Sequence, residues 1–170
     1  LQCVKWVYTR CANIALVNVM PTVPASGPKD AKLAVVGMAP ASQEVRTGRP
    51  FMGESWRILN ETLASYGLSR DDVYVTNILD FPIPLQSSVY SVEAARLLPA
   101  LERLRGELEG VRPNAVLLCG NDPLKALCDL VGVTKWRGSI LTATKMAVGT
   151  KCVVAMHPAN FIRGQWKWLP

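Results

Sequence analysis

Short apolar runs alternate with longer amphipathic segments along most of the chain. The apolar runs are rich in Val, Leu and Ala and end near polar or turn-forming residues, as buried strands do. They lie at residues 33–37, 73–79, 115–120, 139–144 and 151–156. Amphipathic segments at 53–66, 91–109 and 122–131 carry apolar residues on one face and predict helices. Pro99 is expected to interrupt the second of these helices.

The N-terminal part of the chain has a different pattern. Residues 1–20 are apolar with scattered aromatics, which predicts a helix that packs on the rest of the protein. Residues 21–32 are rich in Pro, Ser, Gly and Lys and predict a connecting loop. The length of 170 residues suits one compact core. Residues 1–170 are therefore expected to form a single domain, with the N-terminal helix and connecting loop over 1–30.

Strands that alternate with helices are typical of a mainly parallel sheet covered on both faces. The predicted fold class is α/β: a three-layer α/β/α arrangement around a mainly parallel central sheet of four to five strands. In such sheets the ligand site lies beyond the carboxyl ends of the strands. Functional residues are thus expected in the loops that begin at Gly37, Asn77, Gly120 and His157.

Two of these loops carry residue types that suit a nucleic acid. Arg46, Arg49 and Phe51 lie close together in the loop 38–52, and a basic loop with an aromatic suits a phosphate backbone plus a stacked base. An ordinary strand–helix loop with a packed Phe is the alternative. Asn77 ends the second strand, and its amide offers the one acceptor and two donors that a pyrimidine edge can pair with. A turn-forming Asn is the alternative there.

The loop after the last strand holds the only histidine of the chain, His157. It precedes Pro158, which suits the first turn of a helix. A histidine at the carboxyl end of a strand is well placed to contact a substrate. A structural hydrogen-bonding role is the alternative.

Composition narrows the classes of partner. The formal net charge of +6, from 19 Lys and Arg against 13 Asp and Glu, suits a polyanion such as DNA. No apolar stretch approaches the roughly 20 residues of a membrane span, so no membrane partner is expected. The chain has one histidine and five cysteines without a CxxC pair, so no metal site is expected. The cysteines are expected to be buried reduced thiols, as in a cytoplasmic protein. A nucleotide-binding α/β module is the rival class, but this chain lacks the Gly-rich phosphate loop of such modules.

These loops together resemble the motifs of the uracil-DNA glycosylase superfamily, especially families four and five. The resemblance extends from about Ala31 to Arg163. Its motifs are Gly37-Met-Ala-Pro-Ala41, Gly48-Arg-Pro-Phe-Met-Gly53, Thr76-Asn77, Trp136-Arg137-Gly138 and His157-Pro158-Ala159-Asn160. Each motif alone is weak, and their order and spacing make the resemblance specific.

The resemblance implies a monofunctional DNA glycosylase that flips a deaminated or modified base out of DNA and hydrolyses its N-glycosidic bond with water. Phe51 would stack on the flipped base and Asn77 would read its pairing edge, in a pocket that Met38 and Ala39 also line. His157 would stabilise negative charge on the leaving base, as an oxyanion hole does.

The resemblance also implies how such a protein contacts DNA. Arg46, Arg49, Asn160 and Arg163 are the expected DNA-binding residues. The loop that begins at His157 would enter the minor groove, where Ile162 or Arg163 could fill the gap left by the flipped base. We expect a monomer, with DNA as its partner.

The chain departs from the family pattern at a residue that bears on catalysis. Met38 stands where family four has a Glu. Two carboxylates remain nearby, Glu44 and Glu54, and either can activate water or stabilise the sugar cation. Glu44 is favoured slightly over Glu54, and a surface or helix-start charge is the alternative for each.

A second departure concerns the iron–sulfur cluster of family four, which needs four cysteines. The matching positions here hold Tyr8, Cys11, Phe81 and Leu97, so no cluster is expected.

The apolar turn at Met38 also leaves the substrate open. It suits a different deaminated base, or a hypermodified base of phage DNA, in which case the enzyme would serve antiviral defence. A catalytically weak DNA-binding relative is the remaining alternative.

Overall fold

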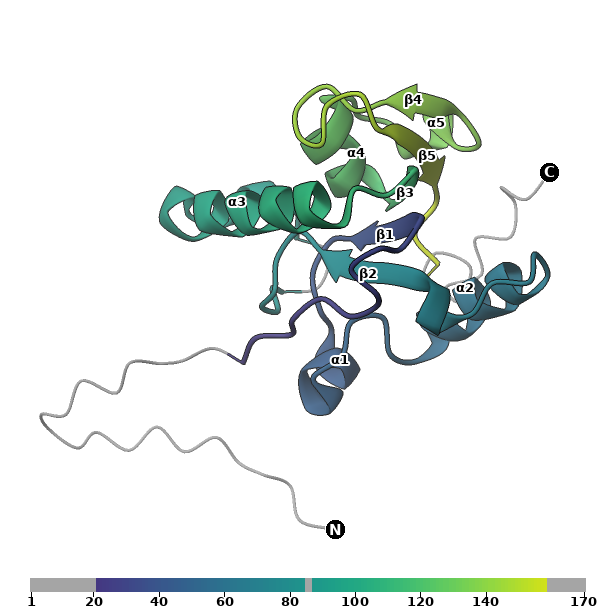
Figure 1. Cartoon of the computed structure of the whole chain (residues 1–170). Coiled ribbons are helices and arrows are strands. Elements are labelled where there is room, and N and C mark those ends of the chain that lie inside the picture. Colours follow the sequence, from purple (N-terminus) through teal and green to yellow (C-terminus); the bar gives the residue numbers. More distant parts are fainter. Residues whose placement is uncertain (1–20, 85–86, 159–170) are drawn as a thin grey trace, which may run out of the picture.

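The computed structural model describes residues 21–84 and 87–158. Its centre is a five-stranded sheet with the strand order β2-β1-β3-β5-β4 (Figure 1). The strands are β1 Leu33–Gly37, β2 Val73–Asn77, β3 Ala115–Cys119, β4 Ile140–Thr142 and β5 Lys151–Ala155. β1 is parallel to β2 and β3, β3 is parallel to β5, and β4 runs antiparallel to β5. The predicted α/β fold with a mainly parallel sheet is confirmed.

Helices cover both faces of this sheet. They are α1 Ser42–Thr47, α2 Glu54–Ala64, α3 Ala94–Val111, α4 Asn121–Cys128 and α5 Val133–Trp136, with 3-10 turns η1 Arg70–Asp72 and η2 Val89–Ser91. Val36 of β1 shares a buried cluster with Leu104 of α3 and with residues of α4. Its neighbour in the strand, Val35, belongs to a second buried cluster, which includes Leu59 of α2. Because neighbouring strand residues point to opposite faces, these two clusters define the expected three layers.

Two boundaries near the first strand differ from the prediction. The segment 38–52 is not a continuous loop, because α1 forms within it and ends at Gly48 in the left-handed conformation. The second strand ends at Asn77, two residues before the apolar run 73–79 ends. Ile78 and Leu79 leave the ladder but remain fully buried, and their N–H groups donate to the carbonyls of Gly37 and Met38. Burial thus continues past the strand, which is why the apolar run is longer than β2.

The third helix also differs from the prediction. α3 begins after Glu93 and continues through Pro99 to Val111 without a break. Proline removes one backbone hydrogen bond, and the buried face that includes Leu104 and Leu108 offsets that loss. α4 ends at Cys128 and not near residue 131, because the next residue adopts the left-handed conformation that ends helices.

The segment before the sheet lies against its edge. Ser26 and Val75 exchange two backbone hydrogen bonds of 2.9 and 2.7 Å, and the N–H of Val23 donates to the carbonyl of Asp80 at 2.6 Å. The predicted connecting loop therefore covers the edge strand β2, which would otherwise present free backbone groups. The helix predicted for residues 1–20 lies outside the described residues. In the described part of the chain, no helix has the length and apolarity to cross a membrane.

Candidate active site

The carboxyl ends of four neighbouring strands meet at one edge of the sheet, as the parallel topology requires. Gly37 ends β1, Asn77 ends β2, and Gly120 and His157 follow β3 and β5. A Cβ added at Gly120 would lie 3.7 Å from Cβ of His157, so these two loops are in contact. The four loops singled out from the sequence therefore form one surface.

Gly37 is the point where the two expected base-binding side chains meet. A Cβ added at Gly37 would lie 2.6 Å from the ring of Phe51 and closer still to Oδ1 of Asn77. Real Cβ atoms essentially never approach other atoms so closely. The absence of a side chain at Gly37 is therefore what allows the Phe51 ring and the Asn77 amide both to lie at this point.

Phe51 is held in an uncommon conformation between this contact and the histidine. Its side chain is 4% exposed, and its backbone φ of 53° lies in the left-handed region, which is unfavourable for a residue with a side chain. The centroid of its ring lies 6.1 Å from that of His157, and the two planes are inclined by 23°. The structure thus brings Phe51, Asn77 and His157 to the same edge of the sheet.

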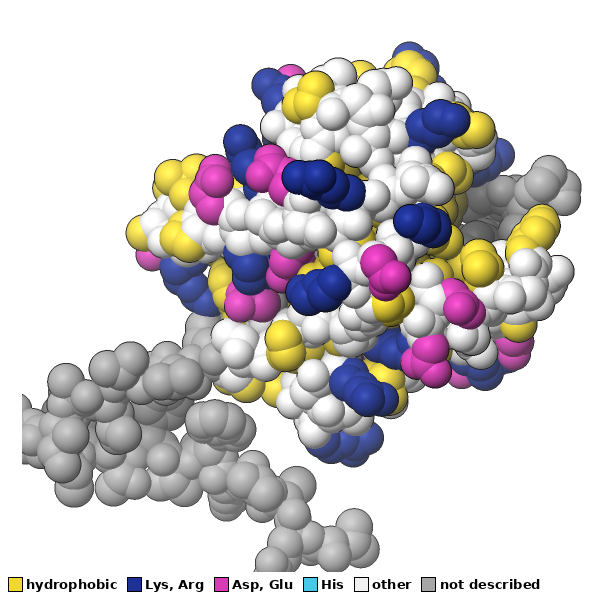
Figure 2. All heavy atoms as spheres, viewed as in Figure 1, with side chains coloured by type: hydrophobic (Ala, Val, Ile, Leu, Met, Phe, Trp, Pro, Cys, Tyr) yellow, Lys and Arg dark blue, Asp and Glu magenta, His cyan; other side chains and the backbone are white. Residues whose placement is uncertain are grey.

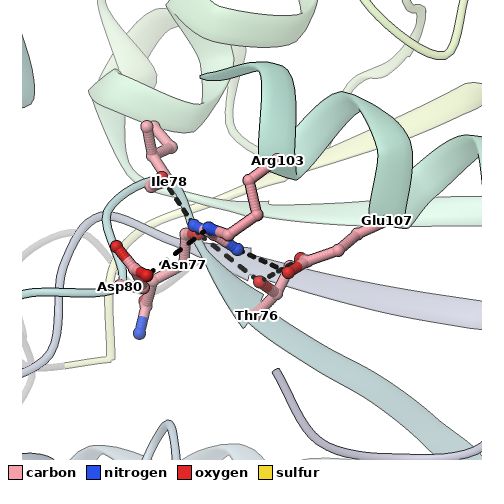
Figure 3. Close-up of polar contacts among 6 residues, drawn as sticks. All are labelled: Thr76, Asn77, Ile78, Asp80, Arg103 and Glu107. Carbon is pink, nitrogen blue, oxygen red and sulfur yellow. Dashed lines mark hydrogen bonds and ion pairs between the residues drawn. The ribbon is translucent and has the colours of Figure 1, made fainter. Parts of the chain in front are cut away.

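A polar network from α3 holds the end of β2 (Figure 3). Nη2 of Arg103 donates to the carbonyls of Asn77 and Ile78, at 2.9 and 2.8 Å. Glu107 accepts a 2.7 Å hydrogen bond from the hydroxyl of Thr76 and a 2.5 Å bond from Arg103. The backbone of Asn77 is therefore fixed from α3, while its side chain, 6% exposed, reaches the other way toward β1.

Sequence reasoning missed this network. Its one local signal is the spacing of Arg103 and Glu107, four residues apart, which places both charges on the same side of a helix. That spacing is also common on exposed helix surfaces, so it does not by itself indicate a contact with the site.

Glu44 occupies the inside of the loop that carries Phe51. Its side chain is 8% exposed, although it belongs to the short helix α1. Oε2 accepts a 3.0 Å hydrogen bond from the N–H of Ala41, and Oε1 accepts a 3.1 Å bond from the N–H of Met52. The carboxylate thus joins the two ends of the loop segment 41–52, next to Phe51.

Glu54 has a different setting. It is the first residue of α2, its side chain is about half exposed, and it accepts a 2.7 Å hydrogen bond from Nε of Arg57. That hydrogen bond lowers the pKa of the Glu54 carboxyl. This arrangement matches the helix-start charge that was the alternative for Glu54.

The described DNA-binding candidates lie on the surface. Arg46 and Arg49 are exposed, within α1 and just after it. Figure 2 shows Lys and Arg side chains at the lower tip of the molecule, over the position of α1 in Figure 1. Asn160 and Arg163, and with them Ile162, lie outside the described residues.

Met38 and Ala39 are half-buried at the start of the same loop. Both pack against the buried cluster under α3 and α4, and the carbonyl of Met38 accepts a 3.0 Å hydrogen bond from Leu79. Met38, which stands where family four has a Glu, is therefore partly buried against the core.

A second arginine, Arg70 of η1, contacts the site from outside and was not foreseen. Nη2 donates to the carbonyl of Pro50 at 2.6 Å, and Nη1 donates to the carbonyl of Phe51 at 3.3 Å. Burial, and secondarily the neighbouring Arg49, lower the pKa of Arg70. No local pattern links Arg70 to a residue 19 positions earlier in the chain.

Two positions that match cluster cysteines of family four are described, and both are apolar. Phe81 is buried in the core with the guanidinium of Arg96 4.1 Å from its ring centroid, and Leu97 packs against the same core. Neither side chain is an iron ligand, so these residues do not fit the cluster. The described residues contain no group of three side chains suited to bind a metal ion. Tyr8 and Cys11 lie outside them.

The described cysteines are buried free thiols, as expected. Burial raises the pKa of Cys119 and of Cys152 to about 12, which keeps both protonated and unreactive.

Comparisons with known proteins identify the family of this chain. The family model of the uracil DNA glycosylase superfamily matches residues 24–167. The type-4 uracil-DNA glycosylase of Archaeoglobus fulgidus is 30% identical over 142 residues, which are 81% of this chain and 70% of that protein. The type-4 enzyme of Pyrobaculum aerophilum is 29% identical over 146 residues, 83% of this chain and 73% of that protein.

The likeness includes both families that the motifs indicate. The type-5 uracil-DNA glycosylase of Pyrobaculum aerophilum is 30% identical over 155 residues, 81% of this chain and 65% of that protein. The chain therefore belongs to the uracil-DNA glycosylase superfamily and is a monofunctional DNA glycosylase.

Proposed function

We propose that this glycosylase removes a deaminated base, with uracil as the first candidate, from DNA by flipping the nucleotide into the site around Gly37. The observation that carries the proposal is that the Phe51 ring and the Asn77 amide both lie at Gly37, with the Phe51 ring stacked near His157, at the carboxyl edge of the sheet. The names of the relatives support uracil as the base. We infer that the enzyme acts as a monomer in the cytoplasm.

Base recognition divides between an apolar face and a polar edge. The Phe51 ring offers a stacking surface that any base can use, since every base has a π-face. Asn77 supplies the pairing edge, with the acceptor and the two donors of its amide. Unstacking a base from DNA costs a few kcal/mol, and these contacts would offset that cost.

The chemistry is the replacement of the base by water. The bond between C1′ and the base nitrogen breaks, and its electron pair leaves with the base. An N–H of His157 donates to an oxygen of the departing base and stabilises the negative charge that develops there. The oxygen of a water bonds to C1′, and its proton passes to a carboxylate or to solvent.

Glu44 is the carboxylate we propose for holding that water. A carboxylate has about four lone-pair sites, and the N–H groups of Ala41 and Met52 use two of them. The remaining sites can accept from a water while the loop keeps the carboxylate fixed. Glu54 is instead tied to Arg57 at the surface, which suits a helix-start charge.

A second candidate substrate is a hypermodified phage base, which would make the enzyme a defence protein. One observation favours it. Met38 stands where family four has a Glu and packs partly against the core, so the first turn carries no acidic side chain. A DNA-binding relative without activity is the outcome that excludes both substrates.

We also propose that the enzyme works without an iron–sulfur cluster, because Phe81 and Leu97 supply apolar packing where the cluster ligands would lie.

The substrate proposal is tested by incubating the protein with oligonucleotides that hold one uracil, one hypoxanthine or one glucosylated hydroxymethylcytosine, followed by alkali. Breaks at uracil are the expected result, because alkali cleaves the strand at the abasic site that a glycosylase leaves. Breaks only at the glucosylated base would support the defence role. Binding of every oligonucleotide without a break at any base would contradict the glycosylase activity itself.

His157→Ala separates catalysis from binding. Because the histidine is proposed to act on the leaving base, the single-turnover rate should fall by about 10²- to 10³-fold. The dissociation constant for uncleaved DNA should change little. Equal losses in rate and affinity, or a lower thermal midpoint of the variant, would assign His157 a structural role.

The two carboxylates are compared by Glu44→Gln and its matched control, Glu54→Gln. The amide of the first variant directs an N–H toward one of the two loop N–H groups, so stability should fall by about 1–3 kcal/mol. Its single-turnover rate should also fall, by about 10²-fold or more. The control should keep the wild-type rate. A rate that drops in the Glu54 variant alone would reverse the assignment.

The cluster proposal predicts a colourless protein. Full-length protein prepared anaerobically, in an iron-supplemented host, should contain no stoichiometric iron and show no visible absorption band. The same preparation should be active in the oligonucleotide assay. Stoichiometric iron with acid-labile sulfide would contradict the proposal, whatever the activity.

A further inference from the structure

Arg70 is the first residue of η1, the turn that precedes β2, and it binds the backbone of the turn that carries Phe51. Its guanidinium donates to two consecutive carbonyls, those of Pro50 and Phe51, and also to the hydroxyl of Ser26 at 3.1 Å. Two donors of one planar group on neighbouring acceptors fix an orientation as well as a distance, which a single donor does not.

The turn at Phe51 needs such a restraint. A left-handed backbone at a bulky residue is unfavourable, and it persists only where the surroundings determine it fully. Gly37 restrains the ring from one side, because it leaves room for the ring and no more. The carbonyls on the other side of the turn are restrained by Arg70.

Arg70 is itself held in place. Its guanidinium lies 4.3 Å from the ring centroid of Trp56 in α2, a cation–π arrangement. The hydroxyl of Ser26, in the segment along the sheet edge, binds it from another element. Contacts from α2, the edge segment and the Phe51 loop therefore converge on one side chain that is partly buried.

We infer that Arg70 is a positioning residue that sets the Phe51 ring for stacking on the flipped base. This inference rests on the proposed function, since it gives the ring a task. It assigns Arg70 no contact with the reacting atoms. Lysine is not an equivalent, because its ammonium lacks the planar fork that spans two carbonyls.

Kinetics provide the first test. Arg70→Ala should lower the single-turnover rate on the best base of the oligonucleotide assay by about 10²-fold, the scale expected for a misplaced binding group. Millimolar guanidinium should restore part of the rate of Arg70→Ala. Arg70→Lys should remain as slow as Arg70→Ala. Arg57→Ala is the matched control, because this arginine pairs with Glu54 and Glu61 on the exposed side of α2. Its rate should equal the wild-type rate and should not respond to guanidinium.

A second test separates positioning from phosphate binding. The salt dependence of DNA affinity reports the number of phosphates that a protein neutralises. Arg70→Ala should leave that slope unchanged. A slope reduced by about one would mean that Arg70 binds a phosphate, and it would overturn the inference.

A third test needs no activity. His157 is the only histidine, so proton NMR shows a single pair of imidazole C–H signals, and the Phe51 ring 6.1 Å away shifts them by its ring current. Phe51→Leu gives the reference without that ring. In Arg70→Ala the signals should move toward the reference and return when guanidinium is added. Arg70→Gln, which keeps one donor group, should lie between and serves if the alanine variant does not fold.

The NMR result and the assay have distinct meanings. Imidazole signals that stay at the wild-type position in a folded Arg70 variant would overturn the positioning role. Signals that move as expected, in a protein that cleaves none of the bases, would leave the role of Arg70 standing and remove the proposed function.

Discussion

The arrangement of the site depends on one close contact at the end of β1. The Phe51 ring and the Asn77 amide both occupy the space where Gly37 would carry a side chain. Parallel pairing sets this contact up, because Gly37 and Asn77 are direct partners in the register of β1 and β2. Any larger residue at Gly37 would push apart the stacking surface and the pairing edge, and the proposed base site with them.

Two arginines bind the backbone near this contact. Packing at Gly37 fixes the side chains, yet the strand end and the turn leave backbone carbonyls that need donors. Arg103, which belongs to α3, binds the carbonyls of Asn77 and Ile78. Arg70 binds those of Pro50 and Phe51 from η1. Each residue of the proposed base site is thus held through its backbone.

The sheet, the strand ends and the arginine contacts differ in how far the sequence predicts them. The sheet and the convergence of Gly37, Asn77 and His157 were predictable, because buried strands give apolar runs and parallel topology aligns their carboxyl ends. Arg103 and Arg70 were not, since each acts on a carbonyl far away in the chain and nothing local marks that contact. The helix α1 was not predictable for another reason. It has six residues and one buried side chain, which is too few to show the apolar repeat of a helix.

In the proposed function, the choice of base depends on which polar side chains remain in the site. Met38 and Ala39 pack back against the core, so the turn that carries an acid in family four contributes no charge here. In the proposed function, discrimination between bases then depends on hydrogen bonds from Asn77 and His157. A site that pairs specific donors and acceptors rejects a base lacking them far more strongly than an apolar wall does, because its buried polar groups would be left unpaired. In the proposed function, selectivity therefore resides at the end of β2, where Arg103 and Glu107 hold the backbone of Asn77.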